Sequence, residues 1–228
     1  MILEEIVVTP FQQIARVVGC EETGRAICVD PGDDAERVVA ALDSRGLTLQ
    51  AIALTHAHMD HVGGVAALKR LRPDAEVILH EGDEPLYYGL PRQPALLGVP
   101  RGQWRALGFE YEEPPRVERH WSDGEVYEVG RLAFKVLHCP GHTPGHVVLF
   151  EPSERIAFVG DCLFAGSIGR TDLPGGSYEE LMDSLTNKIV PLGDDVTVCP
   201  GHGPRTTVGR ERQTNPFLTG AYAPGRFF

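Results

Sequence analysis

The sequence predicts an α/β fold in a single domain spanning residues 1–228. Short apolar segments, partly β-branched and bounded by turn residues, recur along the chain and are typical of strands. Segments with an apolar stripe at helical spacing and a capping residue in front alternate with these strands. The strands and helices form two successive groups, each of strands followed by helices, without a strict internal repeat. A chain of this length can bury a sizeable core in one domain.

The first half is expected to contain three strands, at residues 14–18, 26–29 and 51–54. A helix at residues 34–44 is expected between the last two of these strands. Asp33 or Asp34 is the expected N-cap of that helix, and Gly46 its stop. A second helix is expected at about residues 64–70, ended by Pro73, with a short strand at 77–79. Residues 85–115 contain six prolines and predict an irregular insertion, a flap or a surface segment, with one short helix near 103–107.

The second half repeats this pattern, with strands expected at 131–137, 146–150, 155–159 and 196–199, and helices at 177–188 and 207–213. Ser177 and Glu180 have the spacing of a capping box at the start of the first of these helices. Residues 204–228 are expected to form a short C-terminal tail that includes the last helix.

Charge, hydropathy and cysteine content indicate what kind of partner and which cellular compartment to expect. The formal net charge of −11, with no Lys/Arg cluster, disfavours binding to a nucleic-acid backbone, so the expected partner is a small molecule. No apolar run reaches membrane-spanning length, and residues 1–8 do not have the pattern of a signal peptide. Five cysteines without a CxxC pair fit a reducing compartment, so a cytoplasmic protein is expected. The sequence does not indicate an oligomeric state.

The strongest local signal is a cluster of imidazole and carboxylate groups at residues 55–61, THAHMDH, directly after an expected strand. If the extended backbone continues, His56, His58 and Asp60 point to one side, and His61 follows at the turn. Such ligands suit zinc, iron or manganese better than calcium. The alternative is that these histidines only hydrogen-bond within a loop. Four such groups packed this closely without a metal would compete for donors at a cost in free energy.

Three further candidate ligands each follow an expected strand, namely His142, Asp161 and His202. A glycine stands beside each of them and allows the backbone to approach a metal closely. Loops at strand ends are also where a rigid sheet holds functional groups in register. The sequence therefore predicts one metal site built from several loops.

With these residues the sequence resembles the metallo-beta-lactamase superfamily, and within it the short, single-domain glyoxalase II-like proteins. The pattern of HxHxDH, a later His, an Asp and a final His covers residues 55–203, and the segments 160–176 and 200–218 match the short glyoxalase type. The resemblance implies a four-layer αββα sandwich, in which two mixed sheets pack face to face between helices and the metals lie at one edge.

The resemblance also implies two divalent metal ions, zinc and/or iron and possibly manganese. It assigns three ligands to each ion and one ligand that bridges both ions. The first ion is bound by His56, His58 and His142, the second by Asp60, His61 and His202, and Asp161 is the bridging ligand. Two ions roughly 3.5 to 4 Å apart lower the pKa of a shared water, so a metal-bridging hydroxide is the expected nucleophile. Asp60 and Asp161 are then the expected catalytic carboxylates.

The activity implied is hydrolysis of a glutathione thioester of the S-lactoylglutathione type. The main alternative is a persulfide dioxygenase that oxidises glutathione persulfide with one iron(II) held by two histidines and one aspartate. That group shares the GRTD segment at residues 169–172. A superfamily RNA nuclease is disfavoured by the net charge, and a non-catalytic structural zinc module would more often be Cys-rich and closed.

Four residues near the expected ligands are assigned roles other than metal binding. Arg170 is a candidate for binding a substrate carboxylate, with a local pair to Asp172 as the alternative. Asp30 is a candidate for orienting a ligand histidine, with a simple turn residue as the alternative. His146 is expected to support a ligand loop by a hydrogen bond, and Cys162 to be a small buried side chain.

Overall fold

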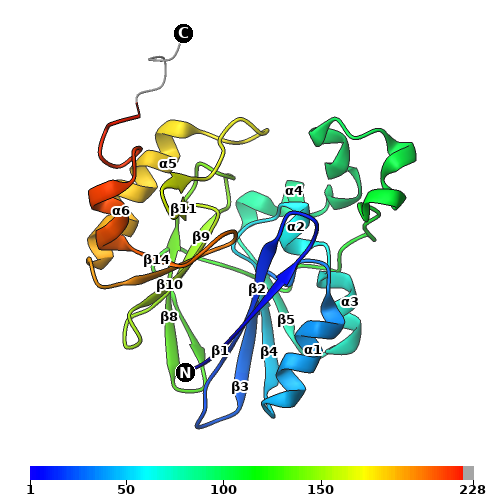
Figure 1. Ribbon diagram of the computed structural model, residues 1–228. Coiled ribbons are helices and arrows are strands. Elements are labelled where there is room, and N and C mark those ends of the chain that lie inside the picture. Colours follow the sequence, from blue (N-terminus) through cyan, green and yellow to red (C-terminus); the bar gives the residue numbers. More distant parts are fainter. Residues whose placement is uncertain (223–228) are drawn as a thin grey trace.

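Two six-stranded β-sheets face each other in the computed structural model, which describes residues 1–222. Helices cover the outer side of each sheet, α1 and α3 on one side and α5 and α6 on the other (Figure 1). This arrangement confirms the four-layer αββα sandwich expected from the sequence.

The first sheet has the strand order β1-β2-β3-β4-β5-β6, with the bounds Ile2–Val8, Gln13–Gly19, Arg25–Val29, Thr48–Ala53, Glu76–Leu79 and Arg119–His120. β1 to β3 pair antiparallel, whereas β3, β4, β5 and β6 pair parallel. Parallel neighbours need a crossover, which is supplied by α1 (Ala35–Ser44) between β3 and β4 and by α3 (Val65–Leu71) between β4 and β5. These helices therefore lie on one face of the sheet.

The second sheet has the order β14-β13-β10-β9-β8-β7, with the bounds Thr206–Thr207, Thr197–Pro200, Ile156–Gly160, Val147–Glu151, Leu132–His138 and Val126–Val129. Only β10 and β13 pair parallel, and α5 (Tyr178–Ser184) lies in the crossover between them. A small hairpin of β11 (Leu163–Phe164) and β12 (Ser167–Ile168) precedes that helix, and α6 (Val208–Thr214) follows β14.

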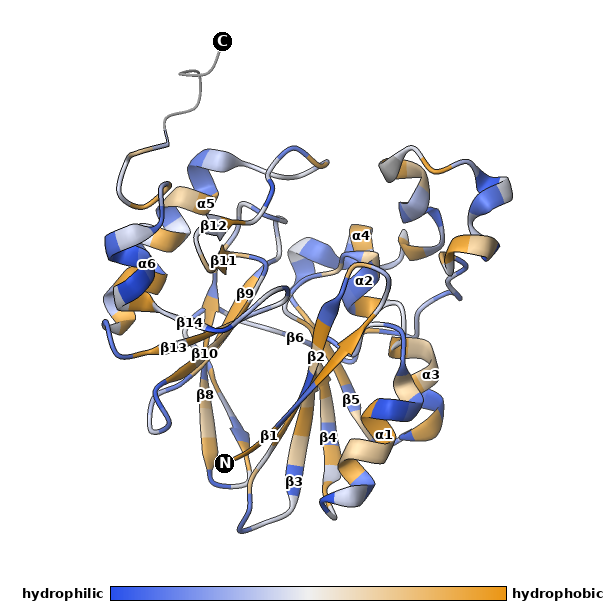
Figure 2. Ribbon diagram, in the orientation of Figure 1, coloured by the Kyte–Doolittle hydropathy of each residue, from blue (hydrophilic) through white to orange (hydrophobic). Residues whose placement is uncertain are grey.

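The alternation of side chains along each strand builds three apolar layers. On β4, Ile52 packs with the residues of α1 and α3, while Ala51 and Ala53 face the space between the sheets. On β10, Phe158 faces the same central layer and Ala157 faces α5. The strands accordingly carry mostly hydrophobic residues, whereas the outer surfaces of the helices are hydrophilic (Figure 2). Both sheets are buried on two sides, which keeps the edge that carries the loops rigid.

Most of the elements expected from the sequence are present, and two caps act as predicted. The Asp34 side chain accepts a hydrogen bond from the backbone N–H of Arg37 at the start of α1, and Ser177 accepts one from Glu180 N–H at the start of α5. The helix expected at 177–188 continues from α5 into a π-helical segment, Leu185–Ile189. β1 and β7 were not predicted, because Glu4 and Glu5 interrupt the apolar residues of β1 and because β7 has only four residues.

The segment expected to be irregular, residues 85–115, contains a series of short helices. They are α4 (Glu84–Tyr87), which follows the 3-10 turn η1 (Glu81–Asp83), and the 3-10 helices η2 (Leu90–Leu97), η3 (Arg101–Gln103) and η4 (Arg105–Leu107). The Phe109 ring stacks on Phe11 of the β1–β2 turn, with centroids 5.4 Å apart. The insertion therefore packs against the end of the sandwich instead of extending into solvent.

The helices of the described region are all short, since the longest α-helix, α1, has 10 residues. A bilayer-spanning helix needs about 20 predominantly apolar residues. No helix among residues 1–222 therefore has the length and apolar character needed to cross a membrane.

Main-chain hydrogen bonds join the two sheets at one edge of the sandwich. The N–H of Ile14 on β2 donates to the Gly201 carbonyl at 2.8 Å, and the N–H of Val147 on β9 donates to the Thr55 carbonyl at 2.8 Å. Gly201 and Thr55 each directly precede a candidate metal ligand. The two halves of the chain are thus fixed to one another at the site.

Candidate metal centre

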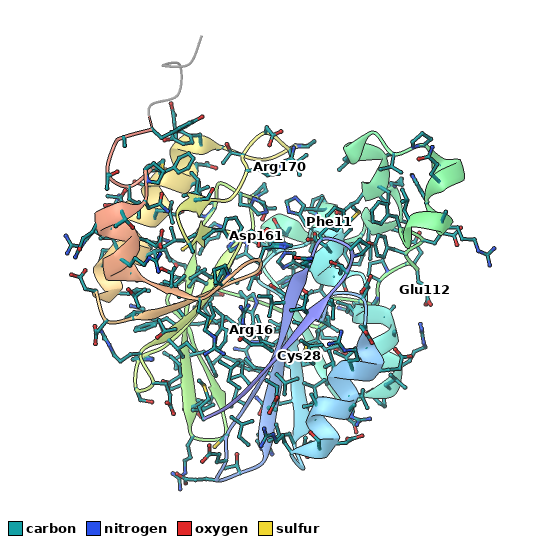
Figure 3. All side chains as sticks on the ribbon, in the orientation of Figure 1. Phe11, Arg16, Cys28, Glu112, Asp161 and Arg170 are labelled. Carbon is teal, nitrogen blue, oxygen red and sulfur yellow. The ribbon has the colours of Figure 1, made fainter. Side chains whose placement is uncertain are left out.

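The candidate ligands lie on loops at the same edge of both sheets. The first sheet supplies the loop after β4, and the second sheet supplies the loops after β8, β10 and β13, which carry His142, Asp161 and His202. Figure 3 places Asp161 at this edge, where Phe11 and Arg170 line the same cavity. The fold thus brings all seven predicted ligands to one place, although the first and the last, His56 and His202, are 146 residues apart in sequence.

The backbone of the HxHxDH segment differs from the prediction. It is extended only as far as His58, which has φ −69° and ψ 147° and is the N-cap of the one-turn helix α2 (Met59–Val62). Asp60 and His61 lie on this helical turn, so strand alternation does not place them. The expectation of an extended run through Asp60 was wrong, because a four-residue helix is too short to leave a periodic signal.

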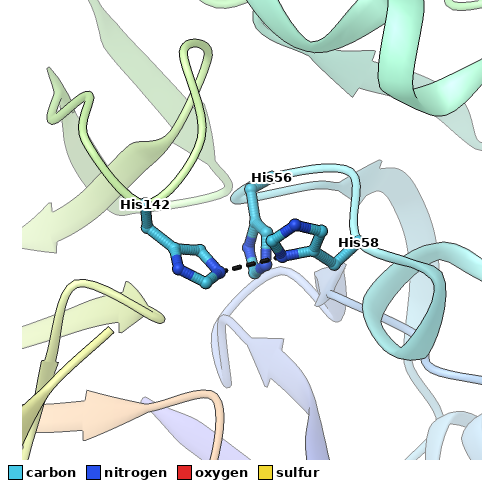
Figure 4. Close-up of side chains that lie close together, drawn as sticks. All are labelled: His56, His58 and His142. Atoms are coloured by element: carbon cyan, nitrogen blue, oxygen red, sulfur yellow. Dashed lines mark hydrogen bonds between the residues drawn. The ribbon is translucent and has the colours of Figure 1, made fainter. Parts of the chain in front are cut away.

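His56, His58 and His142 form the first group of ligands, with one ring nitrogen from each lying within 4.8 Å of the others (Figure 4). The His142 Nδ1–H donates to the carbonyl of Arg170 at 2.8 Å, which leaves its Nε2 with a free lone pair. The His58 Nδ1 lies 2.9 Å from that Nε2 and is its hydrogen-bond partner. A bound cation would replace this shared proton and take both nitrogens as ligands.

Asp60, His61 and His202 form the second group. The His202 Nε2 lies 3.1 Å from Asp60 Oδ2, and the His61 Nε2 lies 3.9 Å from the same oxygen. Asp161 faces both groups, because its Oδ1 is 3.4 Å from His61 Nε2 while its Oδ2 is 3.6 Å from His202 Nε2 and 3.7 Å from His142 Nε2. Its two oxygens can serve two ions at once.

Asp30 holds two of the ligand histidines in one tautomer. Its Oδ2 accepts from His61 Nδ1–H at 2.9 Å and from the Thr55 hydroxyl at 2.6 Å. Since that hydroxyl hydrogen is used, the Thr55 oxygen accepts from His56 Nδ1–H at 3.0 Å. Nε2 of both histidines then points to the centre with a free lone pair. These contacts favour the orienting role for Asp30 over a turn that bonds only to its own backbone.

Burial keeps two histidines of the first group, His56 and His58, neutral, as metal binding requires. Desolvation, followed by the charges of His61 and His142, lowers the pKa of His56 well below its ordinary value. Desolvation, followed by the charge of His142, lowers the pKa of His58 to about 3. These two nitrogens are therefore available to a cation over the whole physiological range.

The second group has the opposite character. Burial alone would lower the pKa of His61, but the carboxylates of Asp161 and Asp60 raise it well above its ordinary value. The pKa of His202 is raised as well, since its bond to Asp60 and the charge of Asp161 outweigh burial. Burial alone would raise the pKa of Asp161, yet the charge of His61, followed by those of His142 and His202, lowers it overall. Positive charge on these two histidines therefore compensates the buried carboxylates.

Unpartnered polar atoms support the fit of this site to metal ions. Within residues 1–222, His56 Nε2, His61 Nε2 and Asp161 Oδ1 are buried without a hydrogen-bond partner. Such groups are costly to bury unless something binds them. These three atoms point toward the same space between the ligand groups. The donor set contains only histidine and aspartate, which suits two divalent ions of the zinc, iron or manganese type.

Two side chains other than the ligands hold the ligand loops by hydrogen bonds, Gln93, which was not predicted, and His146, which was. Gln93, on η2 of the insertion, accepts from Met59 N–H at 2.8 Å and donates to the Ala57 carbonyl at 2.7 Å. No sequence signal marks a single Gln in a proline-rich segment. His146 accepts from the backbone N–H of Asp161 at 3.1 Å, so it supports the Asp161 loop. Cys162 is buried, and its Sγ contacts His146 Nδ1 at 3.3 Å.

A cavity of about 270 Å³ opens onto the two groups. Its apolar lining comes from Phe11, Met59, Leu96 and Leu173. Arg170 also lines it and pairs with Asp172 through two bonds of 2.7 Å. The local pair considered for Arg170 is therefore present, and the side chain nevertheless borders the cavity. This volume is close to the lower end of the range of about 300–1,000 Å³ for small-molecule pockets, so the cavity can hold a thioester group and part of its substituents.

The Metallo-beta-lactamase superfamily profile matches residues 9–202, which include all seven predicted ligands. The chain belongs to the metallo-beta-lactamase superfamily. Among curated proteins, this superfamily member is 40% identical to a hydroxyacylglutathione hydrolase named GloC from Haemophilus influenzae, over 96% of this chain and 98% of the relative. It is accordingly assigned as a hydrolase of the superfamily.

Solved structures of superfamily members match the fold closely. The B3 metallo-beta-lactamase BLEG-1 is 38% identical with a TM-score of 0.82, over 96% of this chain and 100% of that one. The protein TTHA1623 in a di-iron-bound form is 42% identical with a TM-score of 0.80, over 94% and 100%. ETHE1 from Myxococcus xanthus is 26% identical with a TM-score of 0.78, over 96% and 85%. The superfamily binds divalent metals, which agrees with the donor set.

Proposed function

We propose that the protein is a thioester hydrolase that cleaves a glutathione thioester of the S-lactoylglutathione type with the help of two divalent metal ions. The observation that carries this proposal is the position of Asp161, whose two carboxylate oxygens face the two ligand groups from between them. Such a bridge favours a two-metal hydrolytic centre over a single-metal one. The 40% identity to a hydroxyacylglutathione hydrolase supports the choice of substrate.

Two divalent ions would lower the pKa of a water molecule toward neutrality and stabilise the negative charge that develops on the thioester carbonyl oxygen. The residues of the chain position these ions. His142 is held by the Arg170 carbonyl, and His56 and His61 are held through Asp30. A thiolate leaves readily without a proton donor, because thiol pKa values lie near 8.5. No side-chain nucleophile or general acid is required.

The cavity lining supports a substrate with an apolar part and a carboxylate. Phe11 and Leu96 are partly exposed at the cavity, where they can contact the hydrocarbon part of a thioester. Arg170 has donors beyond those used by Asp172, and these can bind a glutathione carboxylate. Arg170→Ala is therefore expected to raise KM several-fold and to leave kcat nearly unchanged. An unchanged KM for every accepted thioester would remove this role.

Metal content and thiol release, measured together, test the proposal. Protein purified without added metal or chelator is expected to contain two metal ions per chain and to release thiol from S-lactoylglutathione. Asp161→Asn keeps the size of the side chain but removes one ligand oxygen, so it should reduce the content to one ion. It should also lower kcat/KM at least about 100-fold, since even partners behind the ligands are worth 10- to 100-fold. Asp183→Asn, exposed on α5, is the matched control.

Persulfide oxidation is the second candidate. The observation that favours it is the convergence of two histidines and one aspartate, because His142 Nε2 lies 2.9 Å from His58 Nδ1 and 3.7 Å from Asp161 Oδ2. Such a set with open positions suits a single iron(II). One iron per chain, with oxygen consumption on glutathione persulfide and no thioester cleavage, would favour this candidate and reject the hydrolase.

A further inference from the structure

Asp83 lies outside both ligand groups, yet its carboxylate joins the two loops that supply the first group. The side chain is fully buried at the end of η1 (Glu81–Asp83). Its Oδ2 accepts from the Ala57 N–H at 2.9 Å and from the Thr143 hydroxyl at 2.8 Å. Its Oδ1 accepts from the Gly145 N–H at 2.6 Å. Ala57 lies between His56 and His58, and Thr143 directly follows His142.

These contacts are not the ordinary use of an aspartate at this position. Asp83 is the N-cap residue of α4, where a carboxylate usually accepts a hydrogen bond from its own helix, but its side chain makes no such bond. Nor is it a member of any ion pair found within residues 1–222. All three hydrogen bonds that the side chain accepts come from the two ligand loops.

The chemistry of the contacts requires a carboxylate. All three partners of Asp83 are donors, and an ionised carboxylate has only acceptor sites. An asparagine of the same size would turn an amide N–H toward the Gly145 N–H or toward the other two donors. A buried carboxylate that bonds to N–H groups also forms stronger hydrogen bonds than a neutral acceptor.

The loop after β8 is shaped to meet Asp83. A Cβ atom on Gly145 would lie 2.5 Å from the Asp83 nitrogen and 2.8 Å from Asp83 Oδ1, so only glycine fits there. On the other side, a Cβ atom on Gly82 would lie 3.1 Å from the Gly145 Cα. The η1 backbone and the His142 loop therefore touch directly, and the Asp83 carboxylate is locked between them.

We propose that Asp83 is a positioning residue that fixes the loop of His56 and His58, from the first sheet, against the loop of His142, from the second sheet, and thereby sets the geometry of the first metal position. This inference rests on the metal centre of the proposed function but not on its substrate. The second ligand group has no contact with Asp83 among the hydrogen bonds described, so the effect is specific to one of the two positions.

Zinc titration of metal-free protein against a chromophoric chelator tests the proposal. Asp83→Asn is expected to weaken one of the two zinc sites 10- to 100-fold and to leave the other unchanged. His142→Ala and His202→Ala serve as references for loss of the first and the second position. The Asp83→Asn titration should resemble that of His142→Ala and differ from that of His202→Ala. Glu81→Gln, exposed on the same 3-10 turn, is the control and should bind zinc as the unaltered protein does.

Thr143→Val covers the case in which Asp83→Asn does not fold. It removes one of the three hydrogen bonds with almost no change in volume, so it should weaken the same zinc site by a smaller factor. Equal weakening of both sites, or no weakening in either variant, would overturn the positioning role. If the selective loss is found but no thioester is cleaved by the unaltered protein, the proposed substrate fails and the role of Asp83 stands.

Discussion

Gly201 is the position where one methyl group is expected to disable the centre. It lies between β13 and His202, and a Cβ atom there would lie 2.6 Å from His61 Cε1 and closer still to Asp161 Oδ1. Its φ is not in the left-handed region, so alanine is compatible with the backbone and the effect of Gly201→Ala is purely steric. Both atoms that the methyl group meets belong to candidate ligands.

The displacement follows from these distances. Ordinary van der Waals contact begins at 3.4 Å, so the His61 ring must move by at least 0.8 Å, the difference from 2.6 Å. Misplacement of a catalytic group by about 1 Å can cost on the order of 100-fold in rate. We therefore expect kcat/KM for the thioester to fall about 100-fold and the second metal position to bind more weakly. Strain of this kind costs about 1–3 kcal/mol in the free energy of unfolding, so the protein should remain folded.

The assay combines thiol release, metal content and denaturant unfolding for Gly201→Ala and for a control in the same loop. Gly203→Ala is suitable, because a Cβ there meets nothing within 4 Å. Its φ of +74° should cost about 1–2 kcal/mol of stability while the metals are retained. Normal metal affinity and activity in Gly201→Ala would refute the argument that this close approach fixes His61 and Asp161.

Three further predictions concern the metal-free and the metal-loaded protein. The folded state lowers the pKa values of His56 and His58, so the free energy of unfolding decreases as the pH falls below about 6.5, where the unfolded chain takes up protons. The folded state raises the pKa values of His61 and His202, so the free energy of unfolding decreases as the pH rises above about 6.5, where the unfolded chain loses protons. Metal-free protein should therefore be most stable near that pH, and a steady trend in denaturant unfolding from pH 5 to 9 would contradict this. Free metal at 100 times its Kd should raise the free energy of unfolding by about 2.7 kcal/mol per site, whereas equal stability with and without chelator would argue against binding to the folded state. Cys162→Ser should retain its full metal content at a cost of roughly 1–3 kcal/mol, because the buried thiol bonds only to neighbouring protein groups, and loss of one ion would make it a ligand.

The ligand loops were predictable from sequence because their signals are local. His56, His58, Asp60 and His61 are close in sequence, and each further candidate follows a strand rich in apolar residues. Side-chain alternation and capping residues then fix the strands and the start of α1 without knowledge of distant contacts. The family pattern added the layer arrangement and the division into two ligand groups.

The remaining features depend on contacts between distant segments. Asp83 and Gln93 bind the backbone around Ala57 from the segment after β5 and from the insertion, respectively, and no spacing rule links them to it. The helical turn at Met59–Val62 is held by surrounding loops such as Gly32, whose carbonyl is bonded to the neighbouring Gly64 N–H. Edge strand β1 is defined by its pairing with β2 more than by its own composition.

The main-chain hydrogen bond from Ile14 to Gly201 affects how the two sheets separate during unfolding. It ties an early strand to the last ligand loop, so neither sheet can separate at that edge without disturbing His202. An ion held by His61 and His202 would act there as a reversible cross-link across a loop of 141 residues, the separation between those two positions. Like a disulfide, such a link restricts the unfolded chain most when the loop is long. Amide hydrogens of both sheets should then exchange through one shared opening event in the loaded protein and through two separate events after chelation.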